Sequence, residues 1–508
     1  MRIALDDLPN DPELLRQLVR DMAAVVGERE GEIERLEAII QQLQRAQYGR
    51  RSERMDPDQL ALALEDLNAD IATAEAKKPV AAKASTEAAK RRALPDHLPR
   101  EDVRLDVEAH TCPHCQGAIH AIGESVSEML DWVPAQLRVL RITRPKYACR
   151  TCKSVVQAPA PERPIGGGLA TPALLAQVLV SKYCDHTPLY RQSKIFARHG
   201  VDIDRSTLSG WVGGAAWWLE ALHRRLADHV MAADHLFADD TPMPVLDPGR
   251  GRTKTGRLWT YVRDDRSWNG PDPPAALYIY EPDRKGERPE AHLRQFKGVL
   301  QVDGYAGYER LTAKGDIRLA ACWAHVRRKF YEIAEATKAP IALEALNRIG
   351  ELYAVEAAVR GQNPSLRRAA RQERSRQLVA SLRGWMERQL MRVPPRGRIA
   401  ETIRYALGRW DELCLYLGDG HLDIDNNPVE RAIRPVALGR KNHLFAGSDG
   451  GGARWAMIAS LIETAKLNGI EPYEWLCSTL EKMVAGHPMN RLDELLPWTG
   501  KPQNPVNT

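Results

Sequence analysis

Long apolar runs are absent from this sequence, and their absence narrows the class of protein. No stretch approaches the ~18 consecutive apolar residues that a membrane-spanning helix needs. Residues 1–7 also lack the apolar core of a signal peptide. Cysteine is scarce, with 8 among 508 residues, which is too few for a disulfide scaffold. We therefore expect a cytoplasmic protein without a membrane partner, whose isolated cysteines are buried as small apolar side chains.

A large excess of charge of one sign is also absent. The 72 Lys and Arg residues and the 67 Asp and Glu residues give a net charge of +5, which is too small by itself to argue for nucleic-acid binding. The hydrophobic share of 44% is ample for a sizeable core, and the length suggests roughly three or four domains. Indications of function must therefore come from local motifs.

The pattern of residues 1–65 predicts a coiled coil followed by a basic arm. Apolar side chains recur at alternating steps of four and three from Leu15 to Leu43, which is the heptad pattern. The pattern favours a coiled coil that dimerises the protein over a surface helix that packs on its own domain. Arg50 and Arg51 follow directly and are candidates for DNA phosphate contacts, although a solvated charge run is the alternative. Residues 66–98 are rich in Ala and Lys and predict a flexible linker.

Paired cysteines in residues 99–160 predict a zinc ribbon. Two Cys-x-x-Cys motifs are separated by 33 residues, a spacing that brings four thiolates around one structural Zn²⁺. A redox Cys-x-x-Cys is the competing interpretation, but it would not need a second pair. Residues 133–142 between the pairs look like a strand. The four predicted ligands are Cys112, Cys115, Cys149 and Cys152.

Residues 161–230 have the helix start and stop signals of a helix-turn-helix DNA-binding region. Thr171 is placed to cap a first helical segment, with a proline directly after it. A second helix ends at Gly200, and a short turn leads to Ser206 as the N-cap of a third helix that would enter a DNA groove. Arg205 is then a candidate DNA contact. Two ordinary packed helices would produce the same pattern.

From residue 231 to residue 470 the pattern changes to short strands followed by helices. Strands are predicted at 236–246, 257–263, 275–280, 299–302 and 317–322, with a helix at 289–296 and another from residue 324. This order matches a ribonuclease-H-like α/β catalytic core, in which strands one and four lie side by side. A helical insertion is expected at about 331–410. Residues 471–508 form a C-terminal segment whose Pro-rich end, 497–508, is expected to be disordered, so the chain as a whole is multidomain α+β.

Three acids are the candidate catalytic residues of this core. Asp239 lies on the first strand, Asp303 ends the fourth strand, and Glu430 lies at the start of a later helix. Phosphodiester cleavage and transfer place charge on the attacking and leaving oxygens, and two divalent ions held by carboxylates can stabilise both. Mg²⁺ (or Mn²⁺) suits such oxygen ligands. Either aspartate could instead begin a turn, and Glu430 could complete a capping box with Asn427 as N-cap. The alternative ligands are Asp240, Asp423 and Asp425.

Basic residues surround these acids in the sequence. They would neutralise phosphates, so DNA binding should weaken steeply with salt. Helix starts that are simply solvated are the alternative. The basic residues proposed to contact DNA near the acids are Arg327, Arg328, Arg431, Arg440 and Lys441, with His325, Lys329 and Arg434 nearby.

Nearly the whole chain resembles the transposases of the insertion sequence 66 family. The motifs that carry the resemblance, besides the paired cysteines, are Tyr-Gly-Arg-Arg-Ser-Glu at 48–53, Tyr-Arg-Gln at 190–192, Arg-Ser-Thr-Leu at 205–208 with Trp211, Ala-Asp-Asp-Thr-Pro at 238–242, Asp-Gly-Tyr-Ala-Gly-Tyr at 303–308, Cys-Trp-Ala-His-Val-Arg-Arg-Lys-Phe at 322–330, Asp-Asn-Asn-Pro-Val-Glu-Arg at 425–431 and Gly-Arg-Lys-Asn at 439–442. The resemblance implies the Asp-Asp-Glu transposase mechanism, with Asp239, Asp303 and Glu430 as metal ligands. The sequence departs from the family at Asp240, where the family commonly has Glu. Of the two adjacent acids, Asp239 is assigned as the ligand because of its position in the motif.

The mechanism implied by the resemblance has two chemical steps. Metal-activated water cuts a strand at each transposon end, and the freed 3′ hydroxyl then attacks target DNA. The expected partners are double-stranded DNA, further copies of the chain in a homodimer or higher oligomer, and small companion proteins of the same element. The expected location is the cytoplasm, at the nucleoid. The rival functions are a catalytically inactive DNA-binding regulator and a nuclease of the same fold that repairs or resolves DNA.

Overall fold

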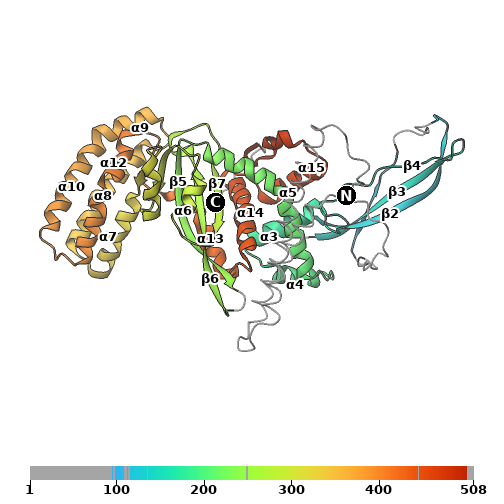
Figure 1. Ribbon diagram of the computed structural model, residues 1–508, viewed down its shortest axis with the longest axis horizontal. Coiled ribbons are helices and arrows are strands. Elements are labelled where there is room, and N and C mark those ends of the chain that lie inside the picture. The colour runs from blue at the N-terminus through green and yellow to red at the C-terminus, as the bar shows by residue number, and fades with distance from the viewer. Residues whose placement is uncertain are drawn as a thin grey trace, which may run out of the picture.

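The protein has a mixed α+β fold that extends along one axis (Figure 1). The computed structural model describes residues 94–499 apart from positions 95, 97, 108–110, 112–114, 134–135, 248–249 and 444. Figure 1 shows a group of helices at one end, a sheet with flanking helices in the middle, and a long β-hairpin at the other end. The predicted coiled coil, the arm with Arg50 and Arg51, most of the linker and Cys112 lie outside the described residues.

The cysteine-containing region is built on a long antiparallel hairpin. Its strands are β1 (Arg100–Arg104), β2 (Ile119–Val133), β3 (Gln136–Cys149) and β4 (Val155–Gln157), in the order β1-β3-β2 with β4 paired to β3. Leu137 and Val139 on β3 are buried, and Arg138 between them turns to Asp131 and Glu101 on the other side. The strand predicted at 133–142 is confirmed for residues 136–142, which belong to β3, whereas Val133 is the last residue of β2.

Three helices connect this hairpin to the central sheet, namely α3 (Pro172–Tyr183), α4 (Leu189–Arg198) and α5 (Arg205–Met231). Thr171 is confirmed as the N-cap of α3, since its hydroxyl accepts from the Leu174 N–H at 3.2 Å. The prediction that Ser206 caps α5 was wrong: the helix begins at Arg205 after Asp204. At 27 residues α5 is also much longer than a groove-reading helix needs to be, because its apolar residues continue at helical spacing into the main core. Its exposed start at Arg205 remains a predicted DNA contact.

The central sheet has five strands in the order β7-β6-β5-β8-β9. They are β5 (His235–Asp247), β6 (Arg252–Arg263), β7 (Ala275–Glu281), β8 (Gly298–Val302) and β9 (Ile317–Ala321). The first three are antiparallel, while β5, β8 and β9 are parallel. The predicted adjacency of the first and fourth strands is therefore confirmed. The second strand begins at Arg252 rather than 257, and the predicted helix at 289–296 is the shorter α6 (Glu287–His292).

One glycine permits the close approach of β5 and β8. Gly298 has a φ of 141°, and a Cβ there would lie 1.9 Å from the Asp234 carbonyl oxygen. The Val299 N–H donates to that same oxygen at 2.9 Å. A larger residue at 298 would therefore push apart the two strands that bring the candidate aspartates together.

Helices cover both faces of the sheet, with α5 on one and α13 (Asn427–His443) and α14 (Asp449–Leu467) on the other, and extend the sheet at one edge. On the latter face, Phe237, Leu258 and Tyr278 pack against α13 and α14. At the β8 and β9 edge, Val299 and Ala320 pack into a second core formed by the helical region. That region consists of α7 (Trp323–Thr337), α8 (Pro340–Val359), α9 (Pro364–Ala370), a π-helical turn (Arg371–Ser375), α10 (Arg376–Leu390), α11 (Arg398–Leu407) and α12 (Trp410–Gly418).

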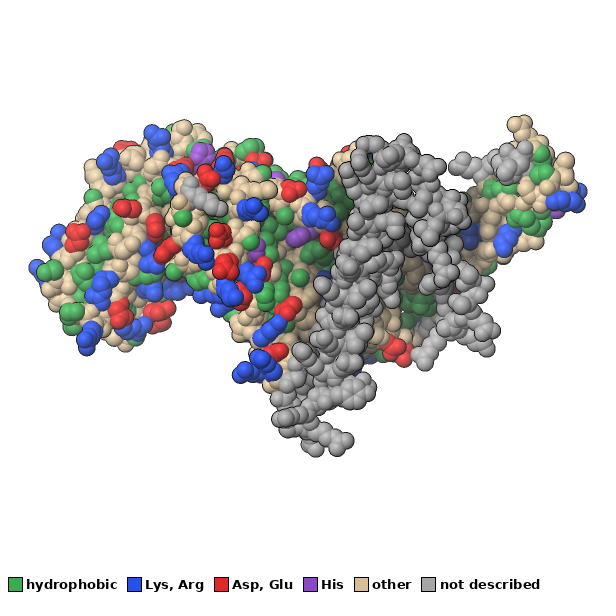
Figure 2. All heavy atoms as spheres, in the orientation of Figure 1, with side chains coloured by type: hydrophobic (Ala, Val, Ile, Leu, Met, Phe, Trp, Pro, Cys, Tyr) green, Lys and Arg blue, Asp and Glu red, His purple; other side chains and the backbone are tan. Residues whose placement is uncertain are grey.

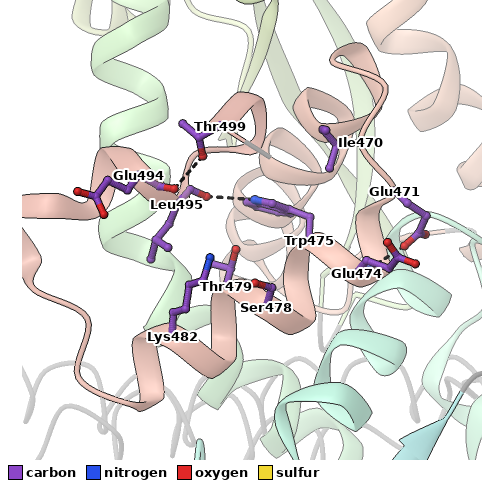
Figure 3. A pocket seen from close by; sticks show the side chains of 10 residues that line it. All are labelled: Ile470, Glu471, Glu474, Trp475, Ser478, Thr479, Lys482, Glu494, Leu495 and Thr499. Atoms are coloured by element: carbon purple, nitrogen blue, oxygen red, sulfur yellow. Dashed lines mark hydrogen bonds between the residues drawn. The ribbon is translucent and has the colours of Figure 1, made fainter. Parts of the chain in front are cut away.

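The C-terminal segment is ordered further than expected. Helix α15 (Pro472–Val484) is followed by 3-10 turns at Met489–Leu495 and Pro497–Thr499. The Trp475 indole donates to the Leu495 carbonyl at 3.0 Å, and the Thr499 hydroxyl donates to the Glu494 carbonyl at 2.7 Å (Figure 3). Disorder from residue 497 was therefore a wrong prediction for Pro497–Thr499, because Thr499 is bonded to Glu494 in a turn that Trp475 holds on α15.

The surface of the helical region carries Lys and Arg interspersed with Asp and Glu (Figure 2). Within the described part of the chain, no helix has both the length and the apolar character that crossing a bilayer requires.

Candidate active site

Asp239 and Asp303 are brought together by the parallel pairing of β5 and β8. The register places Phe237 opposite Gln301. Asp239 lies two residues beyond Phe237 on β5, and Asp303 lies two residues beyond Gln301, directly after the end of β8. β8 ends at Val302, and the Asp303 carboxylate accepts from the Tyr305 N–H at 2.9 Å. The two carboxylates therefore lie at the same end of the sheet.

Glu430 is delivered by the first turns of α13, which is attached to both strands. The buried Asn426 amide donates to the Ala238 carbonyl at 3.0 Å, directly before Asp239 in the chain. The buried Gln301 amide donates to the Asp423 carbonyl and accepts from the Asp423 N–H, each at 2.9 Å. These bonds place the start of α13 beside Ala238 on β5 and beside the end of β8.

The negative charges of Asp303 and Glu430 act on Asp239. Burial is the largest cause that raises the pKa of Asp239 to about 7, and the charges of Asp303, Asp240 and Glu430 raise it further. Like charges gathered in a partly buried site are unfavourable unless a cation compensates them. Carboxylate oxygens are the ligands that Mg²⁺ prefers, so this set of acids fits a hard divalent cation.

The Glu430 carboxylate faces helix α7. One oxygen, Oε2, accepts from Arg328 at 3.0 Å, and Oε1 lies 3.7 Å from His325 Nδ1. The capping-box alternative was wrong for Glu430, because the Asn427 N–H donates instead to Asp425 at 3.2 Å.

Asp240 is buried and paired with arginines, unlike its neighbour Asp239. Its side chain is only 1% exposed. Arg257 donates to Oδ2 at 3.1 Å, and Arg284 donates twice to Oδ1, at 2.9 and 2.7 Å. Arg284 also lies over the Tyr305 ring, 4.1 Å from its centroid. Because both oxygens of Asp240 are held by arginines, the geometry favours Asp239 as the metal ligand of this pair.

The other two alternative ligands are also engaged. Asp423 forms a 2.7 Å ion pair with Arg367. Asp425 accepts from the Asn427 N–H and from the Asn427 amide, at 3.2 and 2.7 Å. Both acids therefore support the loop that precedes α13.

The loop that follows Asp303 is held by residues from the helical region. The Tyr405 hydroxyl donates to the Asp303 carbonyl at 2.9 Å, and Arg409 donates to the Gly304 carbonyl at 3.2 Å. Gly304 has a φ of 94°, and a Cβ there would lie 2.7 Å from Arg409 Nε. Tyr405 on α11 and Arg409, the residue before α12, therefore fix the position of the second aspartate.

The predicted DNA contacts near the site differ in their availability. Arg327 and Arg431 are exposed, whereas Arg328 is paired with Glu430. The positions whose side chains lie outside the described residues are Arg50, Arg51, Arg440 and Lys441.

Several residues that shape the site were not found by sequence reasoning. Gln301 and Arg284 act through contacts with distant segments, so no local pattern marks them, and Asn426 was seen only as part of a family motif. Cys322 was interpreted as a buried apolar side chain and His325 as a neighbour of the DNA contacts, and the two were not considered together as ligands. Their spacing of three residues across the start of α7 puts them on one face of a helical turn, and that signal was available.

The described ribbon cysteines converge as zinc ligands would. The sulfur atoms of Cys115, Cys149 and Cys152 lie within 4.8 Å of one another, and Cys115 and Cys149 are 3.6 Å apart. Backbone N–H groups of Cys152 and Thr151 lower the pKa of Cys149, although burial opposes this shift. The three thiols therefore fit a structural Zn²⁺.

Acids on or directly after neighbouring strands of the sheet, and a cysteine ribbon earlier in the chain, are features expected of a transposase. Family comparison agrees: the model described as "Transposase IS66 family" matches residues 167–454. The chain belongs to this family. Three other models match residues 35–103 ("Transposase C of IS166 homeodomain"), 110–153 ("zinc-finger binding domain of transposase IS66") and 460–498 ("IS66 C-terminal element"). The zinc-finger match supports a structural zinc ion in the ribbon.

Full-length relatives occur in Sinorhizobium fredii (strain NBRC 101917 / NGR234). Uncharacterized protein y4jD is 42% identical over 517 residues, which cover 99% of this chain and 98% of the relative. Uncharacterized protein y4qI is 39% identical over 538 residues, with 99% of each chain covered. The similarity therefore extends over nearly the whole length of both relatives.

Proposed function

We propose that this transposase binds the ends of its element, cuts DNA strands there and joins the 3′ ends to target DNA. The observation that supports the proposal is the environment of Asp239, because the charges of Asp303 and Glu430 act on this carboxylate although both residues lie far from it in the chain. The sheet order, three antiparallel strands followed by parallel pairing, is also the order of a ribonuclease-H-like core. We assign that fold to residues 231–470.

The three acids would hold divalent Mg²⁺ or Mn²⁺, which stabilises charge on the attacking and leaving oxygens of a phosphodiester. The chain's own residues prepare this site. Arg328 orients Glu430, and Gln301 and Asn426 fix the start of α13. Water is the nucleophile of the cutting step, and the freed 3′ hydroxyl is the nucleophile of the joining step. Neither step needs a covalent protein intermediate.

DNA is positioned in this proposal by exposed basic residues and by the N-terminal regions. Arg205, Arg327 and Arg431 are exposed and would contact phosphates, which makes binding sensitive to salt. The ribbon and the helices α4 and α5 would recognise the ends of the element. The predicted coiled coil would pair two copies of the chain, so that both ends are held together, and companion proteins of the element would join the complex.

The test uses DNA that carries the inverted repeats flanking the gene. Wild-type protein should cut this DNA in Mg²⁺ or Mn²⁺, and Asp303→Asn should abolish cutting while it still binds the same DNA at the same salt concentration. Asp411→Asn, at an exposed position on α12, is the matched control and should cut normally. Full activity of Asp303→Asn would refute the assignment. A wild-type protein that binds but never cuts would instead indicate a DNA-binding regulator.

A further inference from the structure

A second group of metal-ligating atoms lies beside the candidate active site. The sulfur of Cys322, a ring nitrogen of His325 and a carboxylate oxygen of Glu430 all lie within 4.8 Å of one another. Cys322 follows β9 directly, His325 lies in the first turn of α7, and Glu430 comes from α13. Three elements therefore converge on one point.

Two of the candidate ligand atoms in this group are free to bind a metal ion. Oε2 of Glu430 is paired with Arg328, but Oε1 faces His325 Nδ1 at 3.7 Å. Both Oε1 and Nδ1 are buried atoms, and neither has a hydrogen-bond partner among the residues that the structure describes. A buried polar atom without a partner costs free energy, and a bound cation would satisfy both atoms at once.

The third ligand is held in place by the loop before α13. Cys322 is 3% exposed, and its sulfur accepts from the Asn426 N–H at 3.2 Å. The same Asn426 donates its amide to Ala238 next to the candidate aspartates. The position of the sulfur is therefore linked to the backbone that also places Glu430.

The chemistry of the donors selects the metal. Thiolate, imidazole and carboxylate together are typical ligands of Zn²⁺, whereas Mg²⁺ prefers oxygen alone. Three protein ligands also leave one position of a tetrahedral ion open. The group therefore differs in kind from the three acids with which it shares Glu430.

We propose that Cys322, His325 and Glu430 form a zinc site separate from the cysteine ribbon, and that zinc bound there inhibits the enzyme. Binding transfers the thiol proton of Cys322 to solvent and forms bonds from sulfur, nitrogen and oxygen to the ion. While Glu430 is bound to zinc, its carboxylate is not available to hold the catalytic metal together with Asp239 and Asp303. The inhibitory half of this proposal rests on the proposed transposase function, whereas the binding half does not.

Binding is tested on the full-length chain with its ribbon loaded with zinc. Added Co²⁺ should give the absorption of a tetrahedral ion with a thiolate ligand, and this absorption should be lost in Cys322→Ser. Cys414→Ser removes a half-buried thiol on α12 outside the group and should keep it. Because Cys322 is buried and its variant could fail to fold, His325→Gln, at a partly exposed position, provides a second variant. Equal Co²⁺ spectra in the wild type and in His325→Gln would overturn the site.

Inhibition is tested by DNA cleavage at fixed Mg²⁺ with increasing Zn²⁺. Each variant is compared with its own rate without added zinc. Losing a direct ligand should raise the zinc concentration needed for inhibition by more than the about 10- to 100-fold that loss of an outer-shell partner costs in affinity. Equal sensitivity in Cys322→Ser, His325→Gln and the wild type would overturn the regulatory role. Absence of cleavage in Mg²⁺ without zinc would count against the proposed function instead, and the Co²⁺ spectra would still decide the site.

Discussion

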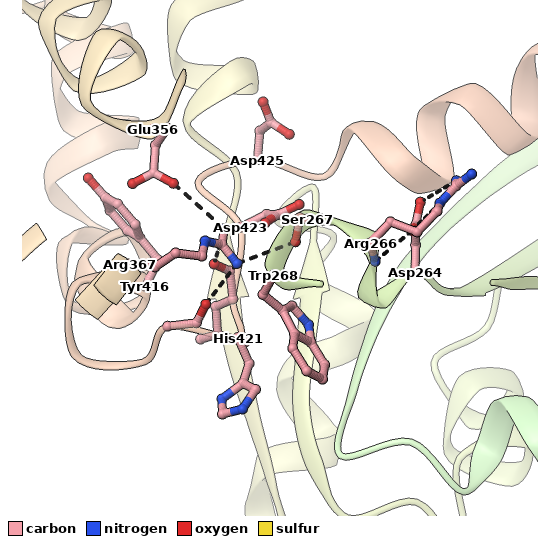
Figure 4. A network of polar contacts seen from close by, with 12 residues as sticks. Asp264, Arg266, Ser267, Trp268, Glu356, Arg367, Tyr416, His421, Asp423 and Asp425 are labelled. Carbon is pink, nitrogen blue, oxygen red and sulfur yellow. Dashed lines mark hydrogen bonds and ion pairs between the residues drawn. The ribbon is translucent and has the colours of Figure 1, made fainter. Parts of the chain in front are cut away.

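The acids of the candidate site and the acids around Arg367 and Arg371 differ in how their charge is compensated. The second group, which we call the arginine network, consists of Glu356, Arg367, Arg371 and Asp423 (Figure 4 shows all but Arg371 with labels). Arg371 is completely buried and donates to both oxygens of Glu356, at 2.8 and 2.6 Å. Each acid of the network therefore has a buried cation.

Asp239 has no such partner. It accepts one backbone N–H, and no cation among the described residues lies within ion-pair distance of it. Its neighbour Asp240, by contrast, is held by two arginines. Compensated buried charge can be explained by structure alone, whereas gathered and uncompensated charge is costly and indicates function. This contrast identifies the site more sharply than the presence of acids does.

The largest effect is expected from breaking the arginine network. Arg371→Met would leave Glu356 buried with a poorer partner and would remove bonds to the carbonyls of Tyr416, Asp419 and Leu422. Such a loss typically costs about 3–5 kcal/mol. Urea unfolding would measure it. The control Arg374→Met, at an exposed position in the same π-helical turn, should change stability by less than about 0.5 kcal/mol. If the two variants were equally stable, the network would not stabilise the fold.

A buried titratable group can also avoid the cost of an unpaired charge by staying neutral, and His223 on α5 is an example. Burial lowers the pKa of His223 from 6.5 to about 4. Between these values the unfolded chain binds a proton that the folded chain does not. Its contribution is therefore fully present above pH 6.5 and is lost as the pH falls towards 4, by at most about 3 kcal/mol.

The measurement for His223 is the stability difference between the wild type and His223→Gln as a function of pH. The wild type should lose stability relative to the variant only as the pH falls through this window. A difference that does not change with pH would show that the ring is not held neutral.

Gln301 connects the two groups of acids, since it lies two residues before Asp303 and holds Asp423. Gln301→Leu would leave the Asp423 N–H without its partner, at a cost of about 1–3 kcal/mol. A shift of Glu430 by about 1 Å would lower the cleavage rate about 100-fold. As a positioning residue, Gln301 should affect the rate of cutting but not the affinity for DNA. The exposed Gln295→Leu is the control and should be neutral in both assays.

The sequence was sufficient to predict the five strands of the central sheet, because each is a short apolar run. The assignment of Asp239, Asp303 and Glu430 as metal ligands stays a prediction. The sequence was also sufficient for the described ribbon cysteines, because their spacing alone predicts convergence. It could not indicate that Gln301 binds Asp423, since the two lie 122 residues apart and neither stands in a distinctive local pattern. Ser206 was a plausible N-cap by residue type, but packing decided that α5 begins at Arg205. Local chemistry was therefore predictable, and the contacts that join distant segments were not.

The smallest effect should come from two adjacent acids whose substitutions act in opposite directions. Asp240→Asn weakens charge-assisted bonds to Arg257 and Arg284 and should destabilise the fold by about 1.5–3 kcal/mol. Asp239→Asn is a substitution of the same size that removes one of several like charges. Without metal it should therefore stabilise the fold by about 1–3 kcal/mol, which is the free energy that an unsatisfied buried group costs. Urea unfolding in chelator would measure both. In Mg²⁺ the wild type should gain stability and Asp239→Asn should gain less, since an ion that binds only the folded state stabilises it. Equal destabilisation of both variants in chelator would show that the two acids have the same role. The contrast between compensated and uncompensated charge would then not hold for Asp239 and Asp240.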